Sequence, residues 1–312
     1  MSVTDGGLNS EGEPGAAAGR PARAWLAALL SLAFPGAGQL YAARPWLALI
    51  AWIATVAGGV LALMVIVHAP NAAVIAIAVV AFVALYLAQI VHAWRAARAS
   101  GRTRRPARGV LALVLSGFAV AQVGASSVVT SAVRANIAEP FRVPGSAMEP
   151  AIVAGDYIWA VPRKTSRIAR DAVIVYRFRG QTLLKRAIGL PGDTVEMRDM
   201  HVYRNGALVT EPYAIYDSTA RGTSGEFVWQ RRYMTPGSDT AATAPTIRRW
   251  GPLVVPPARL FVLGDNRDQS LDSRYVGFIV ADSVKGFPVR VYFSYDADRG
   301  HVRWSRIGRR ID

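Results

Sequence analysis

The chain has 312 residues, enough for two domains, with a formal net charge of +15 and 52% hydrophobic residues. It contains no cysteine, which excludes disulfides, thiol catalysis and cysteine-ligated zinc. Its four histidines, at positions 68, 92, 201 and 301, are scattered, so a Ser-His-Asp triad or a histidine-based metal site is disfavoured.

Composition divides the chain into three parts. A polar tail, residues 1–23, precedes a mostly apolar region, residues 24–134, and a mixed polar region, residues 135–312, completes the sequence. Residues 1–134 hold 10 basic and 3 acidic side chains, and the rest hold 26 and 18, so both halves are positive. A basic chain beside a bilayer is predicted to attract anionic membrane lipid rather than nucleic acid.

The apolar region contains four hydrophobic segments. Three of them carry no charged residue and are long enough to cross a membrane, which takes roughly 20 helical residues: Trp46–Val67, Ala72–Ala93 and Gly109–Val133. The first segment, Ala24–Tyr41, is interrupted by a Pro-Gly-Ala-Gly sequence at positions 35–38. Such a break in lipid requires other protein to satisfy the freed backbone groups, so this segment is either a fourth span or a re-entrant hairpin.

The stretch around that break, FPGAGQLYAARPW, resembles small membrane modules with a Pro-Gly-x-Gly-Gln-x-Tyr signature. The alternative is a simple anchor whose first segment is kinked. Orientation follows from the loop Arg95–Arg108, which holds six arginines and no acid and is typical of a loop that stays cytoplasmic. The next segment then runs outward, and residues after Arg134 are expected on the outer face.

After Pro140, short runs rich in Val, Ile, Tyr and Trp alternate with turn residues, a pattern that predicts β-strands. Asn205-Gly206 predicts a tight hairpin, because both turn positions need positive φ. The stretch Asp217–Pro256 lacks periodicity and is expected to form long hairpin loops. The expected strands are Asp156–Val161, Ala172–Phe178, Thr182–Ile188, His201–Val209, Leu260–Leu263 and Val289–Tyr295.

The predicted fold is therefore an all-β domain of twisted antiparallel sheets, tethered by an N-terminal bundle of transmembrane α-helices. Three stretches of this domain concentrate unusual residues. They are VPGSAMEPAIVAGD, LLKRAIGLPGD and FVLGDNRDQSLDSRYVGFI.

The second stretch places Lys185 after an apolar run. Desolvation and the neighbouring Arg186 would both lower the pKa of this lysine, and a neutral lysine is a competent general base. The alternative is that both are ordinary strand residues. The third stretch holds five charged residues from Asp265 to Arg274, which suits an ion-paired loop. A calcium loop is excluded, because Arg267 occupies a ligand position and Ser270 the position that needs glycine.

Together, the patterns PxxxMxPxxxxGD, KRxIGLPGD and GDNRDxSxDSRxxG resemble type I signal peptidases, membrane-bound Ser/Lys serine proteases. The resemblance runs from about Phe141 to Phe293. It implies cleavage of signal peptides from exported preproteins, at the outer face of a bacterial inner membrane. It implies no cofactor and no metal. An extended substrate is expected to add a strand beside Asp156–Val161 or nearby.

Site residues carry over from this resemblance position by position. Lys185 matches the general base, and Ser270 matches the hydroxyl that orients it. Asp272 and Arg274 match a pair that holds the site, and Met148 matches the methionine that follows the nucleophile.

The sequence departs from the family pattern at the nucleophile. Without a gap, the nucleophilic serine aligns with Ala147, the preceding small residue with Ser146, and the position that lends an oxyanion hydroxyl with Gly145. Ala147 offers no oxygen, so this register predicts a protein without peptidase activity. Ser146 could reach Lys185 if the loop turned by one residue, which Gly145 would permit.

Three functions follow as hypotheses. The first is a signal peptidase with Ser146 as its nucleophile. The second is a non-catalytic homologue that binds preproteins or regulates their processing. The third is a lipid-surface anchor, which would have no motif of its own and no interest in preproteins.

Overall fold

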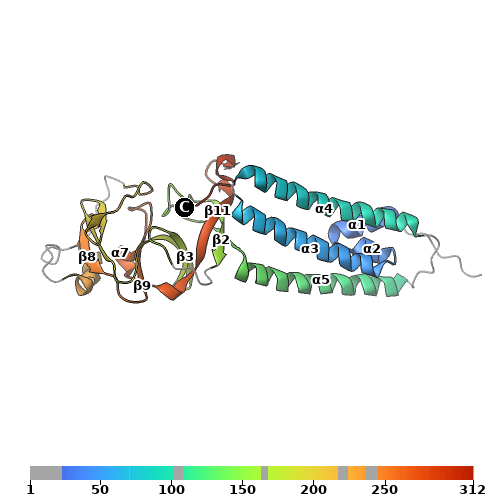
Figure 1. Ribbon diagram of the computed structural model, residues 1–312, viewed down its shortest axis with the longest axis horizontal. Helices are drawn as coiled ribbons and strands as arrows, with labels where there is room; N and C mark the ends of the chain where they lie inside the picture. Colours follow the sequence, from blue (N-terminus) through green and yellow to red (C-terminus); the bar gives the residue numbers. More distant parts are fainter. Residues whose placement is uncertain are drawn as a thin grey trace, which may run out of the picture. The chain divides into compact units, whose positions relative to one another are not determined.

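The computed structural model describes residues 23–69, 71–100, 108–162, 168–216, 224–235 and 245–311 (Figure 1). The chain divides into two compact units. One contains Met1–Ile66 and Ala76–Val129, and the other contains Val67–Ile75 and Thr130–Asp312. The polar tail as far as residue 22, and residues 101–107 of the arginine-rich loop, lie outside the described residues.

The first unit is helical. Three of its helices are long and apolar enough to cross a membrane, which confirms the predicted apolar helices. Their central portions carry no charged residue, so nothing opposes their burial in hydrocarbon. The helices are α1 (Ala24–Ala33), α2 (Ala37–Tyr41), α3 (Pro45–His68), α4 (Ala72–Ala99) and α5 (Arg108–Asn136).

The break between α1 and α2 is a close backbone contact. Gly36 takes a φ of +92°, which favours glycine, and a Cβ there would lie 2.3 Å from the carbonyl oxygen of Ala48. Gly38 has no room either, because a Cβ would lie 2.0 Å from the carbonyl oxygen of Ala27. Gly36 therefore lets the break approach the backbone of α3, and Gly38 lets α2 pack closely against α1.

Amide side chains from the long helices satisfy the backbone at this break. Pro35 lacks an N–H, so the carbonyl of Ser31 loses its helical donor. Gln89 of α4 replaces it, with its Nε2 donating to that carbonyl at 3.0 Å. Gln122 of α5 donates to the carbonyl of Pro35 at 2.6 Å, and Gln39 donates to the carbonyl of Gln89 at 2.9 Å. The freed carbonyls of Ser31 and Pro35 thus have protein donors, as a membrane requires.

The second unit is built from antiparallel sheets, which confirms the predicted fold class. The larger sheet has the order β1-β2-β11-β3-β4-β9-β10, and β12 pairs with β11. Its strands are β1 (Glu139–Arg142), β2 (Asp156–Pro162), β3 (Val173–Phe178), β4 (Gln181–Gly189), β9 (Arg259–Leu263), β10 (Ile279–Val280), β11 (Val284–Asp296) and β12 (His301–Val302).

The smaller sheet has the order β7-β6-β5-β8. Its strands are β5 (Thr194–Arg198), β6 (His201–Arg204), β7 (Ala207–Leu208) and β8 (Trp250–Val254). The unit also contains α7 (Ser273–Val276) and the 3-10 helices η1 (Ser224–Tyr233), η2 (Ala281–Ser283) and η3 (Trp304–Arg306). A core that includes Ile188, Val195, Trp250 and Phe261 packs the two sheets together.

Two sequence expectations need correction. The expected strand His201–Val209 is interrupted at Asn205-Gly206, where both residues take positive φ, so the predicted hairpin turn forms inside it. The expectation of loops throughout Asp217–Pro256 is wrong where η1 and β8 lie, and residues 217–223 and 236–244 of this range lie outside the described residues. Trp250 and Leu253 of β8 are fully buried, and this burial favours a strand despite the Gly-Pro pair between them.

Candidate active site

Lys185 lies on β4, opposite Ile174 of β3, and is 5% exposed. Burial lowers the pKa of Lys185, and the nearby positive charge of Arg274 lowers it further, while Asp272 and Asp265 act in the opposite direction. Desolvation dominates this balance, because the charged ammonium loses its water. Burial therefore shifts the protonation equilibrium of Lys185 toward the neutral amine, the form that can accept a proton.

The loop that follows β9 supplies a fully buried ion pair. Arg274 donates from Nε to Oδ1 of Asp272 and from Nη2 to Oδ2, each at 2.9 Å, and neither side chain is exposed. The N–H of Gly264 donates to the same carboxylate at 3.0 Å. Burial alone would raise the pKa of Asp272, but Arg274, with Gly264 and the Ser270 hydroxyl, holds it below its usual value. Asp272 is thus a fixed negative charge near Lys185.

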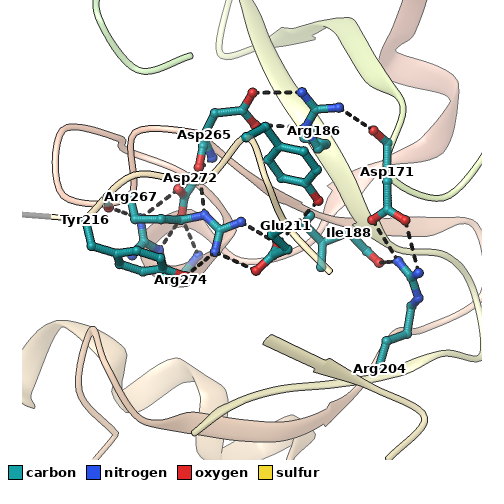
Figure 2. Close-up of polar contacts among 12 residues, drawn as sticks. Asp171, Arg186, Ile188, Arg204, Glu211, Tyr216, Asp265, Arg267, Asp272 and Arg274 are labelled. Atoms are coloured by element: carbon teal, nitrogen blue, oxygen red, sulfur yellow. Dashed lines mark hydrogen bonds and ion pairs between the residues drawn. The ribbon is translucent and has the colours of Figure 1, made fainter. Parts of the chain in front are cut away.

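A second buried pair joins β4 to the same loop (Figure 2). Arg186 donates to both carboxylate oxygens of Asp265 at 2.8 Å and to the carbonyl of Asp171 at 2.7 Å. The ring of Tyr213 lies 3.8 Å from the Arg186 guanidinium. Burial raises the pKa of Asp265 although Arg186 opposes this. The residue next to Lys185 is therefore fixed on three sides.

Arg267 holds the loop from a third direction. Its guanidinium is almost fully buried and contacts Glu211, the hydroxyl of Tyr216 at 2.6 Å and the carbonyl of Gly264 at 3.0 Å. The sequence did not identify Glu211, Tyr213 or Tyr216 as part of this frame. An arginine in this loop that becomes buried requires an acidic partner, but nothing in the sequence indicates which acid pairs with Arg267.

Ala147 lies directly against the charged loop. Its carbonyl oxygen accepts a hydrogen bond from the N–H of Asn266 at 3.1 Å. A Cβ on Gly264 would lie 2.2 Å from Oγ of Ser270 and 2.5 Å from the carbonyl oxygen of Ala147, so Gly264 brings these two residues together. Ser270 itself is 6% exposed.

The residues around Ala147 differ in how firmly they are held. Met148 is 2% exposed and packs in a cluster with Ile152 and Ile158, which anchors the segment. Ser146 is half-buried, and its carbonyl accepts a hydrogen bond from the N–H of Glu149 at 3.0 Å. Gly145 is exposed, and a Cβ there would meet no atom within 4 Å. The segment is thus held at Ser146 and beyond, and Gly145 is its exposed point.

The structure brings Lys185, Ser270, Asp272 and Arg274 to one place, with the backbone of Ala147 beside Ser270. Pairing of a substrate with β2 is excluded, because β2 has β1 on one side and β11 on the other. β4 is different: β9 pairs only with residues from Arg186 onward. Among the described residues, the half of β4 that ends at Lys185 pairs with β3 alone. No group of three acidic or histidine side chains that could hold a metal occurs in this described part.

Known proteins match this region. The family described as signal peptidase, peptidase S26, matches residues 116–293. The chain is 30% identical over 167 residues to signal peptidase I P of Bacillus subtilis subsp. natto, covering 50% of this chain and 77% of the relative. It is 31% identical over 172 residues to signal peptidase I of Bacillus licheniformis, covering 54% and 83%.

A further relative is signal peptidase IB of Staphylococcus aureus strain COL, 31% identical over 153 residues, covering 48% of this chain and 75% of the relative. Among solved structures, a signal peptidase I from Enterococcus faecalis V583 is 32% identical and covers 40% of this chain and 98% of that chain, with a TM-score of 0.27.

Proposed function

The chain belongs to the signal peptidase family, peptidase S26, and from this membership we propose that it binds the signal peptides of exported preproteins beside Lys185 without cleaving them. The observation that supports the absence of cleavage is the position of Ala147. Its backbone is hydrogen-bonded to Asn266 and lies against Gly264, which supports the ungapped register in which its methyl group takes the place of the family's nucleophile. A base without a hydroxyl to activate gives little rate, because the two act as a unit.

The remaining machinery supports binding. The free half of β4 offers backbone groups that an extended peptide can pair with, and alternate side chains of that peptide would enter pockets. Lys185, Ser270 and Asp272 then lie at the end of the added strand, beside the peptide bond that an active relative would cut. A small-x-small rule follows if those pockets accept only small side chains.

We also propose a membrane placement. The three long helices are the spans, and α1 and α2 form a re-entrant hairpin held by Gln89 and Gln122, because α1 has only 10 residues. The β domain then lies on the outer face of a bacterial inner membrane, opposite the arginine-rich loop. Anionic lipid is the partner of its positive charge.

A second candidate function is cleavage through Ser146. One observation favours it: Gly145 is exposed with open surroundings, and a glycine at that point permits a turn that other residues resist. A shift by one residue would exchange the two faces of the segment and bring the Ser146 hydroxyl toward Lys185.

The test uses the full chain purified in detergent, with a preprotein and its mature form as markers. We expect the unaltered chain to crosslink the preprotein through its signal peptide and to leave it uncut. Ala147→Ser should cut it, and Lys185→Met added to Ala147→Ser should abolish cutting. Cleavage by the unaltered chain that Ser146→Ala abolishes would establish the second candidate instead. Absence of any crosslink would overturn the binding function.

A further inference from the structure

A basic pocket lies away from Lys185, at the end of β11. It has a volume of about 620 Å³ and is lined by β12, η3 and the residues around them. Four arginines face it, Arg299, Arg303, Arg306 and Arg309, against one acid, Asp296. The pocket therefore carries an excess of positive charge.

Two of these arginines are neutralised and held in place. Arg303 pairs with Asp296 at 3.1 Å and also donates to the carbonyl of Ala154 at 2.8 Å. Arg306 pairs with Asp156, whose carboxylate is fully buried, at 2.6 Å. These bonds fix the walls of the pocket.

In the described part of the chain, the guanidinium groups of the other two arginines form no ion pair, although the backbone N–H of Arg299 donates to Asp296 at 3.1 Å. Arg299 and Arg309 are both exposed, and each lines the pocket. A guanidinium group can donate two parallel hydrogen bonds to two oxygens of a phosphate. A fixed pocket whose guanidinium groups form no ion pair therefore favours binding of a phosphate. Trp304 also lines the pocket and is 77% exposed, as is typical of tryptophan at a membrane surface.

The chain segment beside the pocket contacts the connection between two proposed spans. Residues Val67–Ile75, which join α3 to α4, belong to the same compact unit as the β domain. Arg290 donates both to the carbonyl of Ala69 in this connection and to the carbonyl of Gly308. The segment that carries Arg309 is therefore tied to the connection between α3 and α4, which the proposed membrane placement puts at the outer surface of the bilayer.

Relying on the membrane placement proposed above, we propose that this pocket binds a phosphate group, and that the phosphate is the headgroup of an anionic phospholipid in the outer leaflet. Arg299 and Arg309 would contact the phosphate oxygens, with Trp304 beside the glycerol backbone. Such a site would hold the β domain against the bilayer next to the point where a signal peptide leaves it.

The test counts lipids bound to the full chain in detergent by native mass spectrometry. The probes are phosphatidylglycerol, phosphatidylcholine and soluble glycerol phosphate. The pocket variant is Arg299→Gln with Arg309→Gln. The control is Arg177→Gln with Arg259→Gln, which removes the same charge from two exposed strand positions outside the pocket.

We expect the unaltered chain and the control to retain phosphatidylglycerol in preference to phosphatidylcholine. The pocket variant should bind phosphatidylglycerol at least about tenfold more weakly than the unaltered chain, since hydrogen bonds to a charged group are lost. Equal losses in the control, or full binding by the pocket variant, would overturn the site. If glycerol phosphate binds as tightly as phosphatidylglycerol, the pocket is a phosphate site, but the proposal that its ligand is a lipid is overturned. No preprotein is present, so failure here leaves the signal-peptide crosslink as a separate result.

Discussion

The carbonyl oxygen of Ala147 accepts a hydrogen bond from the N–H of Asn266, which lies in the loop that carries Ser270 and Asp272. This bond couples the position that we propose to match the family's nucleophile to the loop beside Lys185. Under the proposed function, a serine placed at 147 would therefore lie against the loop that carries Ser270.

Gly264→Ala should damage this contact. The new methyl group would lie 2.2 Å from Oγ of Ser270 and 2.5 Å from the Ala147 carbonyl, and the second contact is with backbone that cannot easily move. We expect a loss of about 1–3 kcal/mol in the free energy of unfolding and no cleavage when the change is combined with Ala147→Ser. Gly145→Ala, at an exposed site with open surroundings, is the control, and equal losses in both variants would contradict the steric argument.

Lys185→Met should stabilise the protein. The folded pKa of Lys185 is lowered, mainly by burial, so charging it costs folding free energy. Between the folded and unfolded pKa values the unfolded chain binds the extra proton, and stability rises with pH. The advantage of methionine is therefore full below the folded pKa and fades as the pH approaches about 10.4, the unfolded value.

Thermal unfolding of the detergent-solubilised chain at several pH values measures this. The gain should be a few degrees at neutral pH. A gain that does not change with pH would mean that packing, rather than charge burial, is responsible.

Asp272→Asn should destabilise strongly. Arg274 is fully buried and would keep its charge without an ionic partner, which costs about 3–5 kcal/mol. Arg198→Gln is the comparison, because it breaks the ion pair with Glu196 at an arginine that is 58% exposed, and such a pair contributes little. Chemical denaturation of both variants tests the difference, and similar midpoints would show that the Asp272 pair is not a structural support.

Acid should weaken the turn between β4 and β5, which contains Asp193. Arg170, the Leu190 N–H and Asn205 lower the pKa of Asp193 to about 2, although burial alone would raise it. A lowered folded pKa means that this stabilisation is complete above the unfolded value of 3.8 and is lost as the pH falls toward about 2. The Asp193→Asn variant should therefore be less stable than the unaltered chain at neutral pH. It should also lose less stability than the unaltered chain as the pH falls from 3.8 to about 2. Identical pH slopes for the two chains would refute this role.

The strands were predictable where side chains alternate or form short apolar runs, as at Val173–Phe178, and the Asn205-Gly206 turn was predictable from backbone chemistry. The strand β8 was missed because Gly251-Pro252 signals a turn locally, while burial of Trp250 in a distant core determines the outcome. Motifs located Lys185 and Ser270. The partner of Arg267, Glu211, could not be found in this way, since only the folded chain joins the two.

The hairpin at Pro35 gives the sharpest test of the membrane unit. Gln89→Leu should remove the only side-chain donor described for the Ser31 carbonyl and cost about 1 kcal/mol. Pro35→Ala alone should change little, but in the Gln89→Leu chain it should restore stability, because alanine supplies the backbone N–H that proline lacks. Thermal unfolding of the two single variants and the double variant measures the coupling. Additive losses would mean that Gln89 acts through packing and does not replace a missing helical hydrogen bond.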